Sequence, residues 1–251
     1  MRSVLPAGGK SAIFDAVDRV GGRYEFSKDL GLQNLVASID PKTGKKNIKP
    51  ALEPPAGRTD LICPGATGAR NWPATAIDPT SNTLYVPLLD NNCMDYGWTL
   101  RSADKIAAGG LDVRLGARPK PDNDGNFGRI EAIDLKTRKV LWSKRQRAPM
   151  ASSLLASAGG LVFSGARDRR FRAFDAATGA LLWQGVLNAS PSSSPATYAV
   201  DGVQYVVVVA GGGGAFDAGS RSLTPEIIDP VAGTTLWVFK LADPSAVAMP
   251  R

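Results

Sequence analysis

Short runs of apolar residues recur along the chain, separated by Gly, Asp, Asn and Pro. The clearest lie at 83–89 (TLYVPLL), 160–166 (GLVFSGA) and 204–212 (QYVVVVAGG). Their length, their β-branched and aromatic content and the turn-forming residues around them are typical of β-strands. Helical spacing is rare, and only 11–20 and 101–109 are expected to form a helical turn or two. The pattern therefore predicts an all-β protein.

One sequence unit repeats. An apolar-x-Asp triplet precedes a turn, and an aromatic or apolar residue follows the Asp at a fixed distance. Three copies carry Trp eight residues after the Asp, at 132–142 (AIDLKTRKVLW), 173–183 (AFDAATGALLW) and 227–237 (IIDPVAGTTLW). Weaker copies lie at 16–26, with Phe26 in the Trp position, at 38–48, with Ile48 there, and, shortened, at 76–85.

The repeat has a direct physical interpretation. An Asp at the head of a turn accepts backbone N–H groups, and Gly supplies the positive φ that a tight hairpin needs. Trp is a large apolar residue that one hairpin cannot bury alone, so successive units must stack. With the intervening strands, each unit resembles a four-stranded antiparallel blade of about 40 to 55 residues. We therefore expect residues 1–251 to form one domain of four to five β-propeller blades or part-blades.

The repeats also suggest that the propeller is incomplete. The first copy begins at residue 16, which leaves no room for the strands that normally precede it. An open array of blades would expose edge strands and apolar faces. We expect the chain to be the C-terminal part of a longer protein whose N-terminal propeller half is missing here.

Composition excludes several kinds of chemistry. The chain has no His, which rules out Ser-His-Asp and Cys-His machinery and a His-ligated zinc within it. No apolar run reaches the roughly 18 residues of a membrane span, and the N-terminal sequence as written carries no secretion signal. The net charge is +7, but the basic clusters at 42–49 and 167–172 are interpreted as solvated turns and strand edges rather than a nucleic-acid site. Steering of an acidic protein partner is the alternative.

Residues 63–73 (CPGATGARNWP) contain one of the two cysteines and several small residues. Taken alone, the stretch is compatible with a redox thiol, a metal ligand, a phosphate-binding loop or a structural corner. The alternatives stay open at the level of this motif.

The repeated Ala-x-Asp-x-x-Thr-Gly-x-x-x-Trp unit resembles the tryptophan-docking motif of quinoprotein alcohol dehydrogenases, eight-bladed propellers that bind pyrroloquinoline quinone (PQQ). Further stretches match the family in order along nearly the whole chain: 8–22 (GGKSAIFDAVDRVGG), 63–73 with 91–98 (NNCMDYGW), 169–183 (RRFRAFDAATGALLW) and 188–214 (NASPSSSPATYAVDGVQYVVVVAGGGG).

The resemblance implies roles for particular residues. Lys10 matches a Lys or Arg that reaches the quinone oxygens, where a cation stabilises developing negative charge. Asn71 matches an Asn that donates to the quinone edge without titrating, and Trp72 follows it as in several family members. Gly212 and Gly213 lie in the Gly-rich turn that approaches the cofactor, although the Trp that many relatives carry there is Gly in this chain. The structural alternatives are an exposed strand-end Lys and a hairpin tip.

The resemblance also accounts for the cysteines, because similar enzymes form a disulfide between cysteines placed like Cys63 and Cys93. A disulfide implies an oxidising compartment, here the periplasm. Two buried free thiols are the alternative.

In the family, the catalytic base is an Asp, and Ca²⁺ or a lanthanide is held by a Glu, an Asn and that same Asp; all three precede the stretch that matches 8–22. No catalytic residue or metal ligand is therefore assigned in this chain, and Asp15 and Asp18 are interpreted as turn and capping residues. The resemblance implies a small alcohol as substrate and a c-type cytochrome as electron acceptor. A non-catalytic propeller scaffold of the outer-membrane assembly type, which binds peptide strands, is the alternative function.

Overall fold

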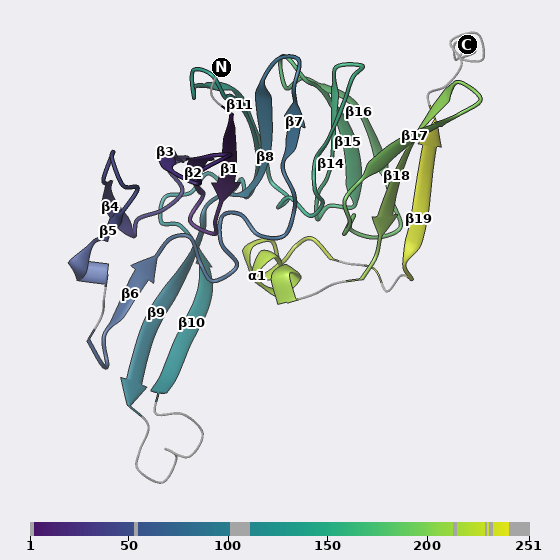
Figure 1. The fold of residues 1–251 in the computed structure, drawn as a ribbon. Coiled ribbons are helices and arrows are strands. Elements are labelled where there is room, and N and C mark those ends of the chain that lie inside the picture. The colour runs from purple at the N-terminus through teal and green to yellow at the C-terminus, as the bar shows by residue number, and fades with distance from the viewer. Residues whose placement is uncertain are drawn as a thin grey trace.

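The computed structural model describes residues 3–52, 55–100, 111–212, 215–228, 230 and 233–240. Within them, nearly every element is a strand and every strand pairing is antiparallel, as predicted. Four sheets stand side by side like the blades of a partial propeller (Figure 1). No helix of this part of the chain has the length and apolar character needed to cross a membrane.

The second and third blades are complete four-stranded sheets, and the first and fourth have three strands each in the described ranges. The strands of the four blades, in chain order, are β1 (Val4–Gly8), β2 (Ile13–Asp18) and β3 (Tyr24–Asp29); β7 (Ala76–Asp78), β8 (Thr83–Leu89), β11 (Gly128–Asp134) and β12 (Val140–Gln146); β13 (Leu155–Ser157), β14 (Leu161–Gly165), β15 (Arg170–Asp175) and β16 (Leu181–Val186); and β17 (Ala196–Val200), β18 (Val203–Ala210) and β19 (Thr235–Lys240).

The remaining elements lie outside the blades. A two-stranded hairpin lies between the first and second blades in the chain. A long three-stranded sheet consists of one strand that precedes the second blade and two strands inserted between β8 and β11 of that blade, and a helix lies below the second and third blades (Figure 1). These elements are β4 (Val36–Ile39), β5 (Lys46–Ile48), the 3-10 helix η1 (Pro50–Leu52), β6 (Thr59–Ile62), β9 (Asn92–Leu100), β10 (Leu111–Pro119) and α1 (Ala215–Leu223).

The register of the strands confirms the repeat. Ala132 pairs with Trp142, Ala173 with Trp183, and Ala16 with Phe26, and a bulge follows directly after each of these alanines. Phe26 therefore occupies the Trp position of the first blade, as the sequence pattern predicted. The bulge is the shared local feature that brings the strand into its turn.

The Asp residues of the repeat head their turns, as expected. The carboxylate of Asp134 accepts the backbone N–H groups of Lys136 and Thr137, and Asp175 makes the equivalent bonds. The Thr137 amide holds the pKa of Asp134 below its usual value, and the Thr178 hydroxyl does the same for Asp175. These carboxylates are structural.

Apolar cores lie between the blades. One cluster joins the first and second blades through residues such as Phe14, Val86 and Ile133. A second cluster joins the second and third, and a third cluster joins the third and fourth. Each blade is thus stabilised by its neighbours rather than by a core of its own.

The Trp docking contact is clearest between the second and third blades. The indole Nε1 of Trp142 donates to the carbonyl of Ala176 at 3.0 Å, and the Tyr85 hydroxyl donates to the same carbonyl at 3.1 Å. A Cβ at Gly179, which has φ +71°, would lie 2.6 Å from the indole. Gly179 therefore provides both the turn conformation and the flat surface against which the Trp lies.

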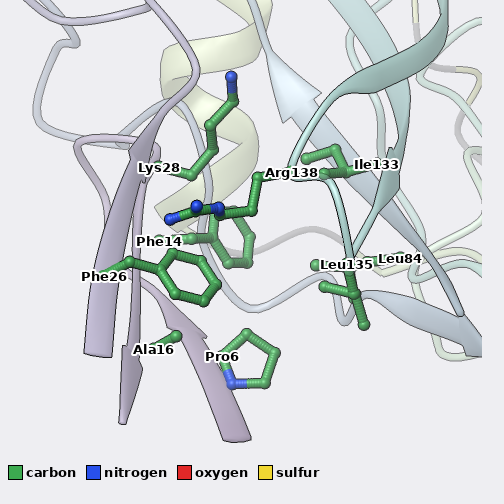
Figure 2. A pocket seen from close by; sticks show the side chains of 9 residues that line it. All are labelled: Pro6, Phe14, Ala16, Phe26, Lys28, Leu84, Ile133, Leu135 and Arg138. Atoms are coloured by element: carbon green, nitrogen blue, oxygen red, sulfur yellow. The ribbon is translucent and has the colours of Figure 1, made fainter. Parts of the chain in front are cut away.

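The junction of the first and second blades uses a different pair. Arg138 stands four residues after Asp134, where Gly179 stands after Asp175, and its guanidinium carbon lies 4.8 Å from the centre of the Phe26 ring. Figure 2 shows the two side chains facing each other at the edge of an apolar cavity of about 20 Å³. Because Arg138 also has φ +61°, the pair replaces the Trp–Gly contact at some conformational cost.

We expect the double substitution Phe26→Trp with Arg138→Gly to rebuild the docking contact, with the indole reaching the Leu135 carbonyl. The double variant should be more stable than the sum of the two single changes predicts, by about 1 kcal/mol or more. Urea unfolding of the four proteins of this cycle measures the coupling. Strictly additive effects would show that the two positions do not form a docking pair.

Several expectations from the pattern were wrong. Residues 11–20 contain strand β2 instead of a helical turn, because Ile13 and Phe14 are buried on successive faces; 101–109 lie outside the described residues. The 38–48 copy forms the β4–β5 hairpin, which belongs to no blade. In the described part of the 227–237 copy, the residues before β19 form no strand, β19 pairs directly with β18, and Asp229 lies outside the described residues.

The cluster at 167–172 is not a solvated turn. Arg167 is buried and donates to the Ile227 carbonyl at 2.5 Å. Asp168 forms ion pairs with Arg170 and Arg172, and the Arg172 side chain is largely buried. The charges are therefore used within the fold, which the sequence pattern alone did not indicate.

Candidate functional site

The 63–73 loop is fixed at its first residue. Cys63 forms a disulfide with Cys93, 30 residues further along the chain, and both cysteines are buried. The backbone N–H of Cys63 donates to the Asn34 side chain at 2.8 Å, and that of Gly65 donates to the Asn92 carbonyl at 3.0 Å. The predicted disulfide is confirmed, and it makes the loop a structural corner.

Lys10 and Asn71 meet at this loop. The Lys10 ammonium donates to the Ala66 carbonyl at 2.8 Å, and the Asn71 amide nitrogen donates to the neighbouring Thr67 carbonyl at 2.9 Å. The backbone of Ala69 also donates to the Lys10 carbonyl at 2.8 Å. Two residues 61 positions apart in the sequence are therefore held on consecutive peptide carbonyls.

The small residues of the loop permit this approach. A Cβ at Gly68, which has φ +79°, would lie 2.8 Å from the Cβ and Cγ of Lys10. Any larger residue would push the lysine away as well as strain the turn. The glycine thus allows the aliphatic part of Lys10 to lie directly against the loop.

Hydrogen bonds to both the oxygen and the nitrogen orient the side-chain amide of Asn71. Its oxygen accepts the backbone N–H of Trp72 at 2.8 Å while its nitrogen donates to Thr67. One of the two protons on the nitrogen remains available to a ligand. Trp72 itself is 45% exposed, so its indole offers an open apolar surface next to that amide.

The donors near the loop suit an electron-rich ligand. Lys10 is exposed, and no ion pair joins it to a carboxylate in the described part of the chain. Arg70 donates to the Gly8 carbonyl at 2.7 Å and lies 5.6 Å from the centre of the Phe14 ring. Burial lowers the pKa of Arg70. Among the described residues, the side chains that meet at this loop are cationic and amide donors, which fits a quinone that carries carboxylates.

Gly212 lies between strand β18 and helix α1. It has φ +73°, and a Cβ there would meet no neighbour within 4 Å, so the positive φ alone requires glycine. Gly213 lies outside the described residues. Helix α1 begins shortly after the turn, and a Cβ at its Gly219 would lie 2.6 Å from the Thr67 side chain.

Asp15 and Asp18 both bond other residues of the fold, but only Asp18 is a turn residue. Asp18 accepts the backbone N–H groups of Val20 and Gly21 in a turn, as expected. Asp15 is not a turn residue: it lies within β2, where it bonds Ser27 and pairs with Lys46 of the β4–β5 hairpin at 2.6 Å. Among the described residues, no three His, Cys, Asp or Glu side chains are grouped as metal ligands.

Sequence reasoning missed the supporting roles of Asn92 and Thr67 at this site. Asn92 is buried and donates to the Thr67 hydroxyl at 3.0 Å and to the Gly68 carbonyl at 3.1 Å. Thr67 thus accepts a bond from Asn92 at its hydroxyl and one from Asn71 at its carbonyl, and its side chain lies against Gly219 of α1. The position of Asn92 beside Cys93 was the available signal, because a disulfide to Cys63 must bring position 92 to the loop. Nothing in the sequence indicated that α1 would pack there.

Comparisons with known proteins agree with this architecture. Residues 33–206 match the family described as "Glucose/ethanol/alcohol dehydrogenase, beta-propeller domain". A quinoprotein ethanol dehydrogenase of Pseudomonas aeruginosa is 31% identical over 242 residues, which is 92% of this chain. A 1-butanol dehydrogenase (cytochrome c) of Thauera butanivorans is 29% identical over 88% of this chain. The structure of a europium-containing methanol dehydrogenase has a similar fold, with a TM-score of 0.83 over 95% of this chain at 24% identity.

The chain spans only part of these proteins. The match covers 38% of the Pseudomonas enzyme, 33% of the Thauera enzyme and 45% of the methanol dehydrogenase chain. The family match nevertheless extends over most of the present sequence, and the antiparallel blades agree with its description as a beta-propeller domain. The chain belongs to the family of PQQ-dependent, or quinoprotein, alcohol dehydrogenases.

Proposed function

We propose that this chain is the C-terminal part of a PQQ-dependent alcohol dehydrogenase that oxidises an alcohol to an aldehyde and passes the electrons to a cytochrome. The observation that carries the proposal is the convergence of Lys10 and Asn71 on the consecutive carbonyls of Ala66 and Thr67. Family membership supports the cofactor, and the names of the relatives support the substrate class and the acceptor.

The residues at and around the 63–73 loop would hold the cofactor in different ways. Bound PQQ supplies the acceptor for the two electrons of alcohol oxidation. The Lys10 ammonium keeps two protons beyond the one it donates to Ala66, and it would hold a quinone oxygen of the bound cofactor and stabilise negative charge there. The free Asn71 proton would be donated to the bound cofactor, and Trp72 would cover an apolar edge of it. Gly212 would contribute backbone that approaches a ligand closely, and Gly213, which lies outside the described residues, is assigned to the same turn by the family resemblance alone.

The catalytic base and the Ca²⁺ or lanthanide site belong, in this proposal, to the part of the family that the chain does not span. The missing propeller half is then an obligatory partner. The net charge of +7 favours an acidic electron acceptor, because opposite charge accelerates encounter. The disulfide supports the periplasm as the location. A peptide-binding scaffold would not require a cation and an amide held together in this way.

The proposal is tested by incubating the 251-residue chain with PQQ, Ca²⁺, ethanol or 1-butanol, and a reducible dye. PQQ absorbance is expected to remain with the protein through gel filtration, while dye reduction stays at the rate of free PQQ. Failure to retain PQQ would contradict the cofactor assignment. Robust alcohol-dependent turnover would show that the chain carries its own base. It would contradict the proposal that the base and the metal site lie in the part of the family that the chain does not span.

A further inference from the structure

Helix α1 approaches the 63–73 loop at Gly219. Gly219 lies within the helix, and a Cβ built there would be 2.6 Å from Cγ2 and 3.2 Å from Oγ1 of Thr67. Glycine is one of the poorest helix formers, so its presence inside a short helix is unfavourable on propensity alone. The close approach to Thr67 is the compensating feature.

Thr67 cannot turn away from the helix without breaking other bonds. Its hydroxyl accepts the buried Asn92 amide at 3.0 Å, which fixes its rotamer with the methyl group towards Gly219. Its carbonyl accepts the Asn71 amide at 2.9 Å. A displacement of Thr67 therefore moves the group that orients Asn71.

The helix is fixed from the other side. Leu223 at its end is buried with Leu89 and Phe127. Arg147 donates to the Leu223 carbonyl at 3.4 Å, and its guanidinium carbon lies 4.9 Å from the centre of the Phe127 ring. Beyond the helix, buried Arg167 donates to the Thr224 hydroxyl at 3.3 Å. An added side chain at position 219 thus displaces the loop more readily than the helix.

We propose that Gly219 is a positioning residue for the cofactor site: the absence of its side chain sets the position of the Thr67 carbonyl and, through it, the direction of the Asn71 amide. The cofactor part of this inference rests on the proposed function. The positioning of Asn71 is a property of the unliganded chain and can be measured separately.

The test uses Gly219→Ala and a rescue variant. Alanine favours the helix but places its methyl against the Thr67 methyl. Adding Thr67→Ser removes Cγ2 and retains the hydroxyl that Asn92 requires, so the double variant should regain the original geometry. Gly159→Ala is the matched control, because a Cβ at Gly159 would meet only the Ser157 hydroxyl at 3.9 Å.

Two readouts separate the possible outcomes. The side-chain amide resonances of Asn71 in the PQQ-free protein, assigned by their loss in Asn71→Asp, should shift in Gly219→Ala and return in the double variant. The dissociation constant of PQQ, measured by fluorescence quenching, should rise about tenfold and then recover, as expected for one misdirected hydrogen bond. Gly159→Ala should change neither quantity.

Unshifted Asn71 resonances in Gly219→Ala would overturn the inference. So would a shift that Thr67→Ser does not reverse, because the effect would then not pass through the Thr67 methyl. If the resonances behave as expected but the wild-type chain does not bind PQQ, the proposed function fails and the positioning of Asn71 by Gly219 stands.

Discussion

Replacing Cys63 and Cys93 by alanine is expected to lower the free energy of unfolding by roughly 3 to 4 kcal/mol. The disulfide closes a loop with a sequence separation of 30 residues that contains the loop of the site and strands β7 and β8. Removing the link increases the freedom of the unfolded chain, while alanine fits the two buried positions without adding a polar group. Urea unfolding measures the change.

The control for this experiment is reduction of the disulfide. Dithiothreitol should lower the stability of the wild-type chain by a similar amount and leave the double alanine variant unaffected. A loss below about 1 kcal/mol in the variant would mean that the link constrains the unfolded chain much less than its span implies.

Gly179→Ala is expected to disrupt the junction of the second and third blades. The positive φ of +71° costs alanine about 1 kcal/mol, and its methyl would overlap the Trp142 indole, which adds about 1 to 3 kcal/mol of overpacking. The indole should leave the Ala176 carbonyl, so a red shift of the Trp emission should accompany the loss of stability. Urea unfolding and fluorescence spectra measure both effects.

Gly160→Ala is the matched control. Gly160 lies in the same blade with φ +75°, but a Cβ there would meet no neighbour within 4 Å. It should show the conformational cost alone. Equal losses in the two variants would indicate that the indole does not depend on the flat surface of Gly179 and would contradict the docking account.

Much of the fold could be predicted because the repeat is a local signal. The strand at 83–89 was placed at its observed bounds, and the eight-residue spacing placed Phe26 in the Trp position, where the structure pairs it with Ala16. The pattern failed where the structure depends on which strands pair across long stretches of sequence. The Asp–Trp spacing is present at 227–237, but β19 pairs directly with β18, a long-range pairing that no local spacing reveals.

The site was partly predictable for a related reason. Lys10, Asn71 and Trp72 were identified by resemblance to a family, and the structure brings the first two to one loop. Asn92 and Gly219 act through contacts between distant segments: a buried amide on the Thr67 hydroxyl, and a glycine against the Thr67 methyl. Asn92 could have been found from its place beside Cys93, because the disulfide brings position 92 to the loop. Gly219 carries no such signal, and its contact with Thr67 becomes visible only when the chain is folded.

The central claim is that Lys10 and Asn71 hold PQQ, and titration of the chain with PQQ tests it most directly. Quenching of protein fluorescence should saturate for the wild-type chain, and Lys10→Ala and Asn71→Asp should each raise the dissociation constant at least about tenfold. Lys42→Ala, on the exposed turn of the β4–β5 hairpin, is the control and should bind like the wild type. Unchanged PQQ affinity in both site variants would contradict the account.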